Sequence, residues 1–107
     1  MKDNELMKKL RASNFIENNG KVLRGINMLR TSFNKLTQIC SALGIDRDDF
    51  ADNINYLSEA GYIRLRNCDT KIPAEFADYS MEELEGKLTA LGIKLLAGKV
   101  TDDCIRV

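Results

Sequence analysis

The sequence concentrates carboxylates in one short segment, where they could bind a divalent cation or repel a polyanion. Asp46, Asp48, Asp49 and Asp52 lie within seven residues. Their spacing lacks the central glycine and the closing glutamate of a calcium-binding loop. Acids in the first turn stabilise a helix by about 0.3–1 kcal/mol each, and Asp46 suits the N-cap. We therefore expect a capped helix here and predict no metal site.

The other reactive side chains form no catalytic set. The sequence has no histidine, and its three cysteines, Cys40, Cys68 and Cys104, are far apart. An odd number of widely spaced cysteines argues against a disulfide framework and against a zinc site. We expect no enzymatic activity, no cofactor and no small-molecule ligand.

The composition is that of one globular domain. The 107 residues are 44% hydrophobic and 30% charged, with a net charge of zero, which suits a single soluble unit. No apolar stretch approaches the ~20 residues that a membrane helix needs, and the N-terminal residues are charged. We expect a cytoplasmic protein without a membrane partner.

The charges are spread unevenly along the chain. Residues 1–35 hold eight cations and three anions, residues 36–86 hold four and eleven, and residues 87–107 hold four and two. The net charges are therefore +5, −7 and +2. Such asymmetry favours electrostatic pairing of two surfaces, within one molecule or between molecules.

Apolar residues at helical spacing predict helices in the first part of the chain. A first helix is expected over about residues 4–17, ended by Asn18-Asn19-Gly20, and a second carries apolar residues from Val22 to Phe33. The first helix, with residues 1–18 as an arm, holds more apolar surface than one small core requires. We expect it to form a dimer interface. Its apolar residues are Leu6, Met7, Leu10, Phe15 and Ile16.

The middle of the chain has the pattern of two helices joined by a tight turn. One helix begins at Asn34 or Leu36 and ends at Gly44, a residue suited to a left-handed C-cap. Asp46 begins the next helix, which stops at Gly61. This order predicts a helix-turn-helix over residues 34–61.

The remainder predicts a β-hairpin followed by a helix. Residues 62–66 alternate apolar and basic side chains, as in a half-buried strand, and the segment to residue 77 contains Pro73. Ser80 begins a capping-box pattern that predicts a helical turn to Glu85, and residues 86–88 resemble a returning strand. Residues 62–88 would form a wing, residues 89–98 a last helix capped by Thr89, and residues 99–107 a tail, with a short strand considered at its end.

Together these elements predict one domain over residues 1–107. The fold class is mainly α (α+β): a winged helix-turn-helix with a short β-hairpin wing and an extra N-terminal helix. The predicted core contains Leu23, Ile26, Leu29, Ile39, Leu43, Phe50, Ile54, Leu57, Ile63, Leu65, Leu88, Ile93 and Leu96.

Two separated segments resemble a known family. Leu36-Thr-Gln-Ile-Cys-Ser-Ala-Leu-Gly-Ile45, followed by Tyr56-Leu-Ser-Glu-Ala-Gly-Tyr-Ile63, is similar to the helix-turn-helix of small bacterial and phage winged-helix proteins, in the broad MarR-like and PadR-like group. Leu88-Thr-Ala-Leu-Gly-Ile-Lys-Leu-Leu-Ala-Gly98 resembles the segment that follows their wing. Together with the small size and the lack of a ligand domain, this closing segment also resembles uncharacterised proteins of prophages.

The resemblance implies a DNA-binding surface. Its base-reading positions would be Arg47, Asp48, Ala51, Asp52 and Asn55, and phosphates would meet Lys35, Thr37, Gln38, Arg64, Arg66 and Lys71. Phosphate neutralisation supplies most of the affinity of such proteins, and four carboxylates oppose it. A positive stripe joining Lys35, Arg64, Arg66 and Lys71 would favour DNA.

Two hypotheses follow. In the first, the protein is a DNA-associated transcriptional regulator or prophage accessory factor that binds double-stranded DNA, as a homodimer. In the alternative, it is a protein-interaction winged helix that does not bind DNA and contacts a basic partner or a second copy. That contact would use Asp46, Asp48, Asp49, Asp52, Leu6 and Leu10.

Overall fold

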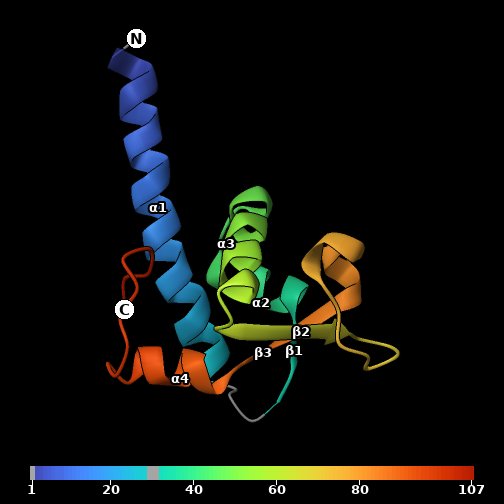
Figure 1. Cartoon of the computed structure of the whole chain (residues 1–107). Helices are drawn as coiled ribbons and strands as arrows, with labels where there is room; N and C mark the ends of the chain where they lie inside the picture. Colours follow the sequence, from blue (N-terminus) through green and yellow to red (C-terminus); the bar gives the residue numbers. More distant parts are fainter. Residues whose placement is uncertain (1, 29–31) are drawn as a thin grey trace.

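The chain folds into helices and strands, and the strands form one antiparallel sheet. The computed structural model describes residues 2–28 and 32–107. The elements, in order, are α1 (Lys2–Asn27), β1 (Asn34–Lys35), α2 (Leu36–Leu43), α3 (Arg47–Glu59), β2 (Ile63–Asn67), the 3-10 turns η1 (Phe76–Asp78) and η2 (Met81–Glu83), β3 (Leu84–Leu88) and α4 (Ala90–Leu96) (Figure 1). The protein therefore has an α+β fold, as expected.

The three described strands form an antiparallel sheet in the order β1-β3-β2. Lys35 of β1 pairs with Glu85 of β3, and Arg66 of β2 pairs with the same glutamate from the other side. In Figure 1, α2 and α3 both lie on one side of this sheet. Leu65 and Leu88 are buried on that side and join the core. The strand residues on the other side of the sheet are polar or charged, among them Arg64, Arg66 and Glu85.

The first two predicted helices are one continuous helix. The break expected at Asn18-Asn19-Gly20 is wrong, because these residues pack against other segments instead of ending α1. The Asn19 amide donates to the carbonyl of Cys104 at 2.9 Å. A Cβ on Gly20 would lie 1.8 Å from the carbonyl oxygen of Arg106, so only glycine admits this approach. The helix then ends at Asn27, earlier than expected.

The predicted turn and cap residues are confirmed around α3 and α4. Gly44 has a φ of 65° at the end of α2, and the Asp46 carboxylate accepts from the Asp48 amide. The hydroxyl of Thr89 accepts from the amide of Gly92 and begins α4. The Ser80 capping box is also present, but it begins only the short turn η2, because β3 starts at Leu84 rather than at residue 86.

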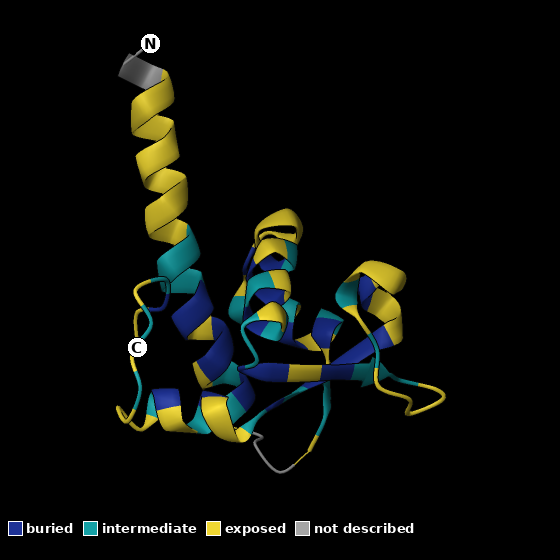
Figure 2. Cartoon of the chain, in the orientation of Figure 1, coloured by how far each residue is buried: buried dark blue, intermediate teal, exposed yellow. Residues whose placement is uncertain are grey.

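The core lies between the helices and the inner face of the sheet. Nine predicted core residues are buried: Leu23, Ile26, Ile39, Phe50, Ile54, Leu57, Ile63, Leu65 and Leu88. Leu43, Ile93 and Leu96 are only partly buried, and Leu29 lies outside the described residues. The prediction missed Val22, Leu36, Ile45, Tyr62, Met81, Leu84, Leu95 and Ile105. Figure 2 shows the contrast between this buried body and the exposed N-terminal half of α1.

The C-terminal segment packs along α1. The short strand considered near residue 104 is wrong, since residues 104–107 carry no strand. The amide of Arg106 donates to the carbonyl of Ile16 at 3.2 Å, and its guanidinium forms an ion pair with Glu17 at 2.5 Å. Ile105 is buried between these contacts. The last residues are therefore a structural strap across the middle of α1.

None of the helices in the described part of the chain combines the length and the apolar composition that crossing a bilayer requires.

Candidate nucleic-acid and protein interfaces

Basic side chains gather on the outer face of the sheet. Successive residues of a strand point to opposite faces, and Leu65 points into the core, so Arg64 and Arg66 point outward. Residues paired directly across strands share a face. The register therefore places Glu85 between Lys35 and Arg66, and Lys87 beside Arg64. We call this surface, completed by Lys71 from the wing, the basic sheet face; its members are Lys35, Arg64, Arg66, Lys71, Lys87 and Glu85.

Glu85 lies at the centre of the basic sheet face. Its side chain is buried, with its Oε1 atom 2.6 Å from Nε of Arg66 and 3.1 Å from Nζ of Lys71. Burial alone would raise the pKa of Glu85, but the hydrogen bonds from Arg66 and Lys71 outweigh it and hold the pKa below its ordinary value. The face thus carries five cations and one carboxylate, and keeps a net positive charge.

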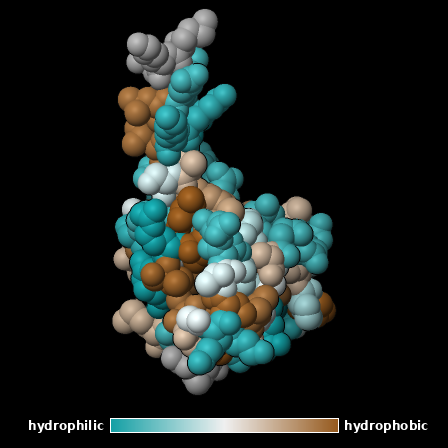
Figure 3. All heavy atoms as spheres, turned by 60° about the vertical axis from the view of Figure 1, so that its left-hand side comes forward, coloured by the Kyte–Doolittle hydropathy of each residue, from teal (hydrophilic) through white to brown (hydrophobic). Residues whose placement is uncertain are grey.

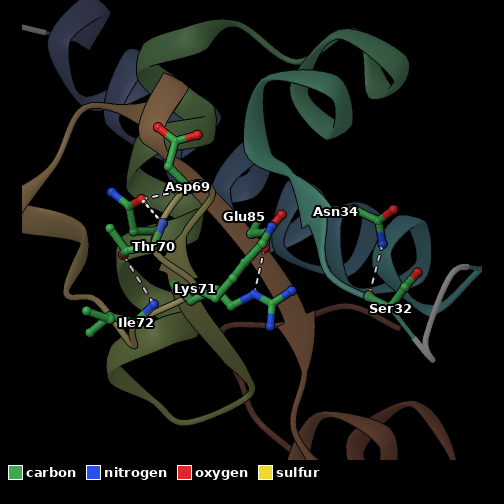
Figure 4. A network of polar contacts seen from close by, with 9 residues as sticks. Ser32, Asn34, Asp69, Thr70, Lys71, Ile72 and Glu85 are labelled. Atoms are coloured by element: carbon green, nitrogen blue, oxygen red, sulfur yellow. Dashed lines mark hydrogen bonds and ion pairs between the residues drawn. The ribbon is translucent and has the colours of Figure 1, made fainter.

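The wing turn holds Lys71 over this carboxylate, as Figure 4 shows. The side-chain oxygen of Asn67 accepts from the amides of Asp69 and Thr70 at 2.8 and 3.0 Å. Lys71 then adopts a φ of 63°, a conformation that costs a non-glycine residue roughly 1–2 kcal/mol. This turn directs the lysine back across the sheet to Glu85.

Phe33 lies among the cations of the basic sheet face. The guanidinium carbon of Arg66 is 3.7 Å from the centre of the ring, with that of Arg64 at 5.7 Å and Nζ of Lys87 at 5.9 Å. These distances are those of cation–π contacts. The sequence placed Phe33 in a helix, which is wrong because α1 ends at Asn27. The ring instead organises the basic side chains.

The exposed face of α3 is acidic. Asp48, Asp52 and Asn55 are exposed along it, at the spacing of one helix face. Arg47, expected to reach a base, instead forms an ion pair with Glu82 of η2. Asp46 caps the helix, and Asp49 is exposed beside it. The positions predicted to read bases thus lie on a surface that carries mainly negative charge.

The predicted contacts at the start of α2 divide between two environments. Lys35 is exposed and belongs to both α2's first turn and the basic sheet face. Gln38 is also exposed, whereas Thr37 is half-buried. Of the predicted phosphate contacts, Lys35, Arg64, Arg66 and Lys71 are therefore brought to one face of the sheet. Arg47, predicted to read a base, pairs with Glu82 instead.

The N-terminal half of α1 projects from the body as an arm. Leu6, Met7 and Leu10 are 57%, 50% and 49% exposed, and Figure 3 shows an apolar patch on one side of the arm. Phe15 and Ile16, also expected at an interface, are half-buried. The ring of Phe15 packs edge-on against Tyr56, with centroids 5.6 Å apart. Within the described part of α1, the exposed large apolar side chains are thus Leu6, Met7 and Leu10.

A tyrosine–aspartate cluster anchors the C-terminal strap. The hydroxyls of Tyr56 and Tyr62 both donate to Oδ2 of Asp102 at 2.7 Å. The hydrogen bond to Asp102, together with burial, raises the pKa of Tyr62 to about 12. Burial and the same carboxylate raise the pKa of Tyr56 as well. Both phenols remain protonated at neutral pH and can donate to Asp102. The cluster is therefore a structural clamp that holds the strap.

The other reactive side chains are isolated. All three cysteines carry free thiols and are partly buried. Among the described residues, no group of three or more histidine, cysteine, aspartate or glutamate side chains is arranged to hold a metal ion. Comparison with protein-family models, with curated proteins and with solved structures finds no match to this chain.

The sequence did not lead us to predict three residues on the outer face of the sheet: Phe33, Glu85 and Lys87. Glu85 and Lys87 alternate with buried Leu84, Gly86 and Leu88, a strand pattern that would have placed both on the outer face. Phe33 gave no such signal, because its apolar spacing also fits a helix. The clamp around Asp102 joins residues 40 and 46 positions apart, which no local pattern reveals.

Proposed function

We propose that this chain is a winged helix-turn-helix protein that associates with double-stranded DNA. The order α1-β1-α2-α3-β2-β3 supports the resemblance to winged helices, and α2 and α3 are joined by the tight turn at Gly44. The hairpin between β2 and β3 supplies the wing. This arrangement is suited to a small transcriptional regulator or prophage accessory factor.

The observation that carries the proposal is the basic sheet face. Although the chain has no net charge, Lys35, Arg64, Arg66, Lys71 and Lys87 gather around one carboxylate. Neutralising phosphates and releasing their counterions supplies most non-specific affinity for DNA. Lys35 at the start of α2 and Lys71 in the wing extend this surface across two elements.

The acidic face of α3 defines the kind of binding that we expect. Asp48 and Asp52 would repel phosphates if α3 entered the major groove, and Arg47 is held by Glu82. Contacts to phosphates fix a protein on the duplex without reading its sequence. We therefore infer weak, salt-sensitive binding with little sequence preference.

A salt titration tests the proposal. We would measure the affinity for a labelled mixed-sequence duplex by fluorescence anisotropy at several salt concentrations. Arg64→Ala and Lys87→Ala should each reduce the salt slope by about 1, because each removes a phosphate contact. Lys94→Ala, which removes an exposed cation from α4, should leave the slope unchanged. No duplex binding at low salt, or equal slopes for all variants, would refute the proposal.

A protein-interaction role is the second candidate, favoured by the acidic face of α3. Here Asp48 and Asp52 would contact a basic protein surface. Replacing both with Asn should then weaken binding of a labelled lysine-rich peptide, while Asp69→Asn in the wing serves as a matched control. Under the DNA proposal, the same double substitution should strengthen duplex binding instead.

A further inference from the structure

The arm of α1 leaves apolar side chains uncovered on a regular helix. Residues 4–14 are all exposed, and Leu6, Met7 and Leu10 account for the apolar surface. Isolated helices of this length are marginal in water without packing against a partner. The arm nevertheless continues the buried helix directly, so it presents this surface in a fixed direction.

A cleft of about 220 Å³ lies beside the base of the arm, between α1 and α3. It is lined by Arg11, Asn14, Phe15, Asn18, Asp49, Asp52 and Asn53. Asn53 is fully buried, and its amide donates to Asn19 and to the carbonyl of Phe15. Its Oδ1 atom finds no donor among the described residues. The cleft therefore combines an aromatic ring, two carboxylates and an unsatisfied buried acceptor.

The arm and the cleft share one face of α1. Met7, Arg11, Asn14 and Asn18 follow one another at spacings of four, three and four, which places them on one helix face. Met7 of the arm thus lies one turn before the cleft residues of α1 on the same face. A second α1 that crosses antiparallel between residues 12 and 13 brings Met7 level with Asn18, and Leu10 level with Phe15, in both copies at once.

We propose that two copies of this chain form a two-fold dimer in which the arm of each lies over the α1–α3 cleft of the other. A second copy also offers the cleft a complementary charge. The arm carries Lys8, next to Met7, and the cleft offers Asp49 and Asp52 beside its own Arg11. An isologous contact of this kind closes at two copies.

This dimer also accounts for the uneven charge of the sequence, because it brings the basic first third against the acidic start of α3. It does not depend on DNA binding, since no member of the basic sheet face takes part. The two proposals therefore fail or succeed separately.

The first test is the oligomeric state, measured by sedimentation equilibrium over a range of concentrations. The double substitution Leu6→Asp and Leu10→Asp should raise the dimer dissociation constant about tenfold or more, because it places charges in the contact. Val107→Asp changes another exposed apolar residue and should leave the constant unchanged. Circular dichroism would confirm that each variant folds.

A charge exchange tests the pairing itself. Lys8→Glu, and separately Asp49→Lys with Asp52→Lys, should each weaken the dimer, and all three changes together should restore it. Restoration would support contact between arm and cleft. A monomer at every concentration, a dimer insensitive to the arm, or a lack of restoration would overturn the proposal.

Discussion

The basic sheet face and the exposed face of α3 are built from neighbouring elements but carry opposite charge. On the sheet, Arg64 and Arg66 alternate with buried residues, so both arginines reach the outer surface. On α3, Asp48 and Asp52 share one helix face, and Arg47, which precedes Asp48, is held by Glu82. The same stretch of chain therefore produces a surface that attracts phosphates and one that repels them.

This contrast shows that charge counted along a segment differs from charge on a face. Residues 36–86 carry a net −7, yet they contribute Arg64, Arg66 and Lys71 to the most basic surface that we identify. The periodicities of strand and helix sort the charges in space. An objection to DNA binding based on the segment as a whole therefore applies to α3 and not to the sheet.

The most disruptive change should remove the support that both faces share. Leu57 is fully buried on α3, which packs on β2. Leu57→Ala should lower the free energy of unfolding by about 2–5 kcal/mol through the cavity that it leaves. Urea unfolding would measure the loss. Leu91→Ala, at an exposed position of α4, should cost far less; similar losses for the two variants would contradict the packing described here.

Removing the central carboxylate should sharpen the difference between the faces. Glu85→Gln takes away the buried partner of Arg66 and Lys71. We expect a loss of about 1–2 kcal/mol in the free energy of unfolding, since Lys71 is largely exposed and hydrogen bonds to charged groups contribute about this much. The same variant should bind duplex more tightly, because the face loses its negative charge and its net positive charge increases. Weaker duplex binding by a folded Glu85→Gln protein would contradict the role of this face.

Acid should weaken the same cluster. The pKa of Glu85 is lower in the folded protein than its ordinary value of about 4.5, so its stabilising contribution is complete above that pH. The contribution is lost as the pH falls below 4.5 through the folded pKa. Chemical unfolding between pH 7 and pH 3 should therefore show a smaller loss of stability for Glu85→Gln than for the natural chain. Parallel curves would contradict the cluster.

The smallest expected effect concerns the acidic face. Asp48 lies in the first turn of α3, and its amide donates to the carboxylate of Asp46. Asp48→Asn should cost about 0.3–1 kcal/mol, because it removes a favourable charge from the positive end of the helix. Thermal unfolding would detect this change, with Asp69→Asn in the wing as a control. An equal effect of the two variants would show that the helix end is not responsible.

Turn and cap residues predicted the helix ends correctly where their only structural role is local. Gly44, Asp46 and Thr89 mark the turn and the two helix starts that they were expected to mark. The helix breakers in α1 misled, because Asn19 and Gly20 are used for contacts with the C-terminal segment. Helix propensity describes the preference of a residue in an isolated helix, and tertiary contacts override that preference here.

The candidate site was predicted in its parts and not in its arrangement. The cations at positions 35, 64, 66 and 71 were identified, and the structure brings them to one surface. The partner of Arg47 could not be foreseen, because Glu82 lies 35 residues away along the chain. The strand pattern could have placed Glu85 on the outer face, but not opposite Arg66. That pairing depends on the register of the sheet, which only the folded structure shows.

The strap across α1 has a consequence for how the protein folds. Its contacts with α1 join residues 82 to 90 positions apart, from Ile16, Glu17 and Arg24 to Arg106. Contacts between distant positions form slowly, because a long loop must close before they contribute stability. On the ribosome, the middle of α1 must therefore wait for residues 104–106 before it reaches its final packing. Until then, the glycine and asparagines of that stretch remain a weak point in the helix.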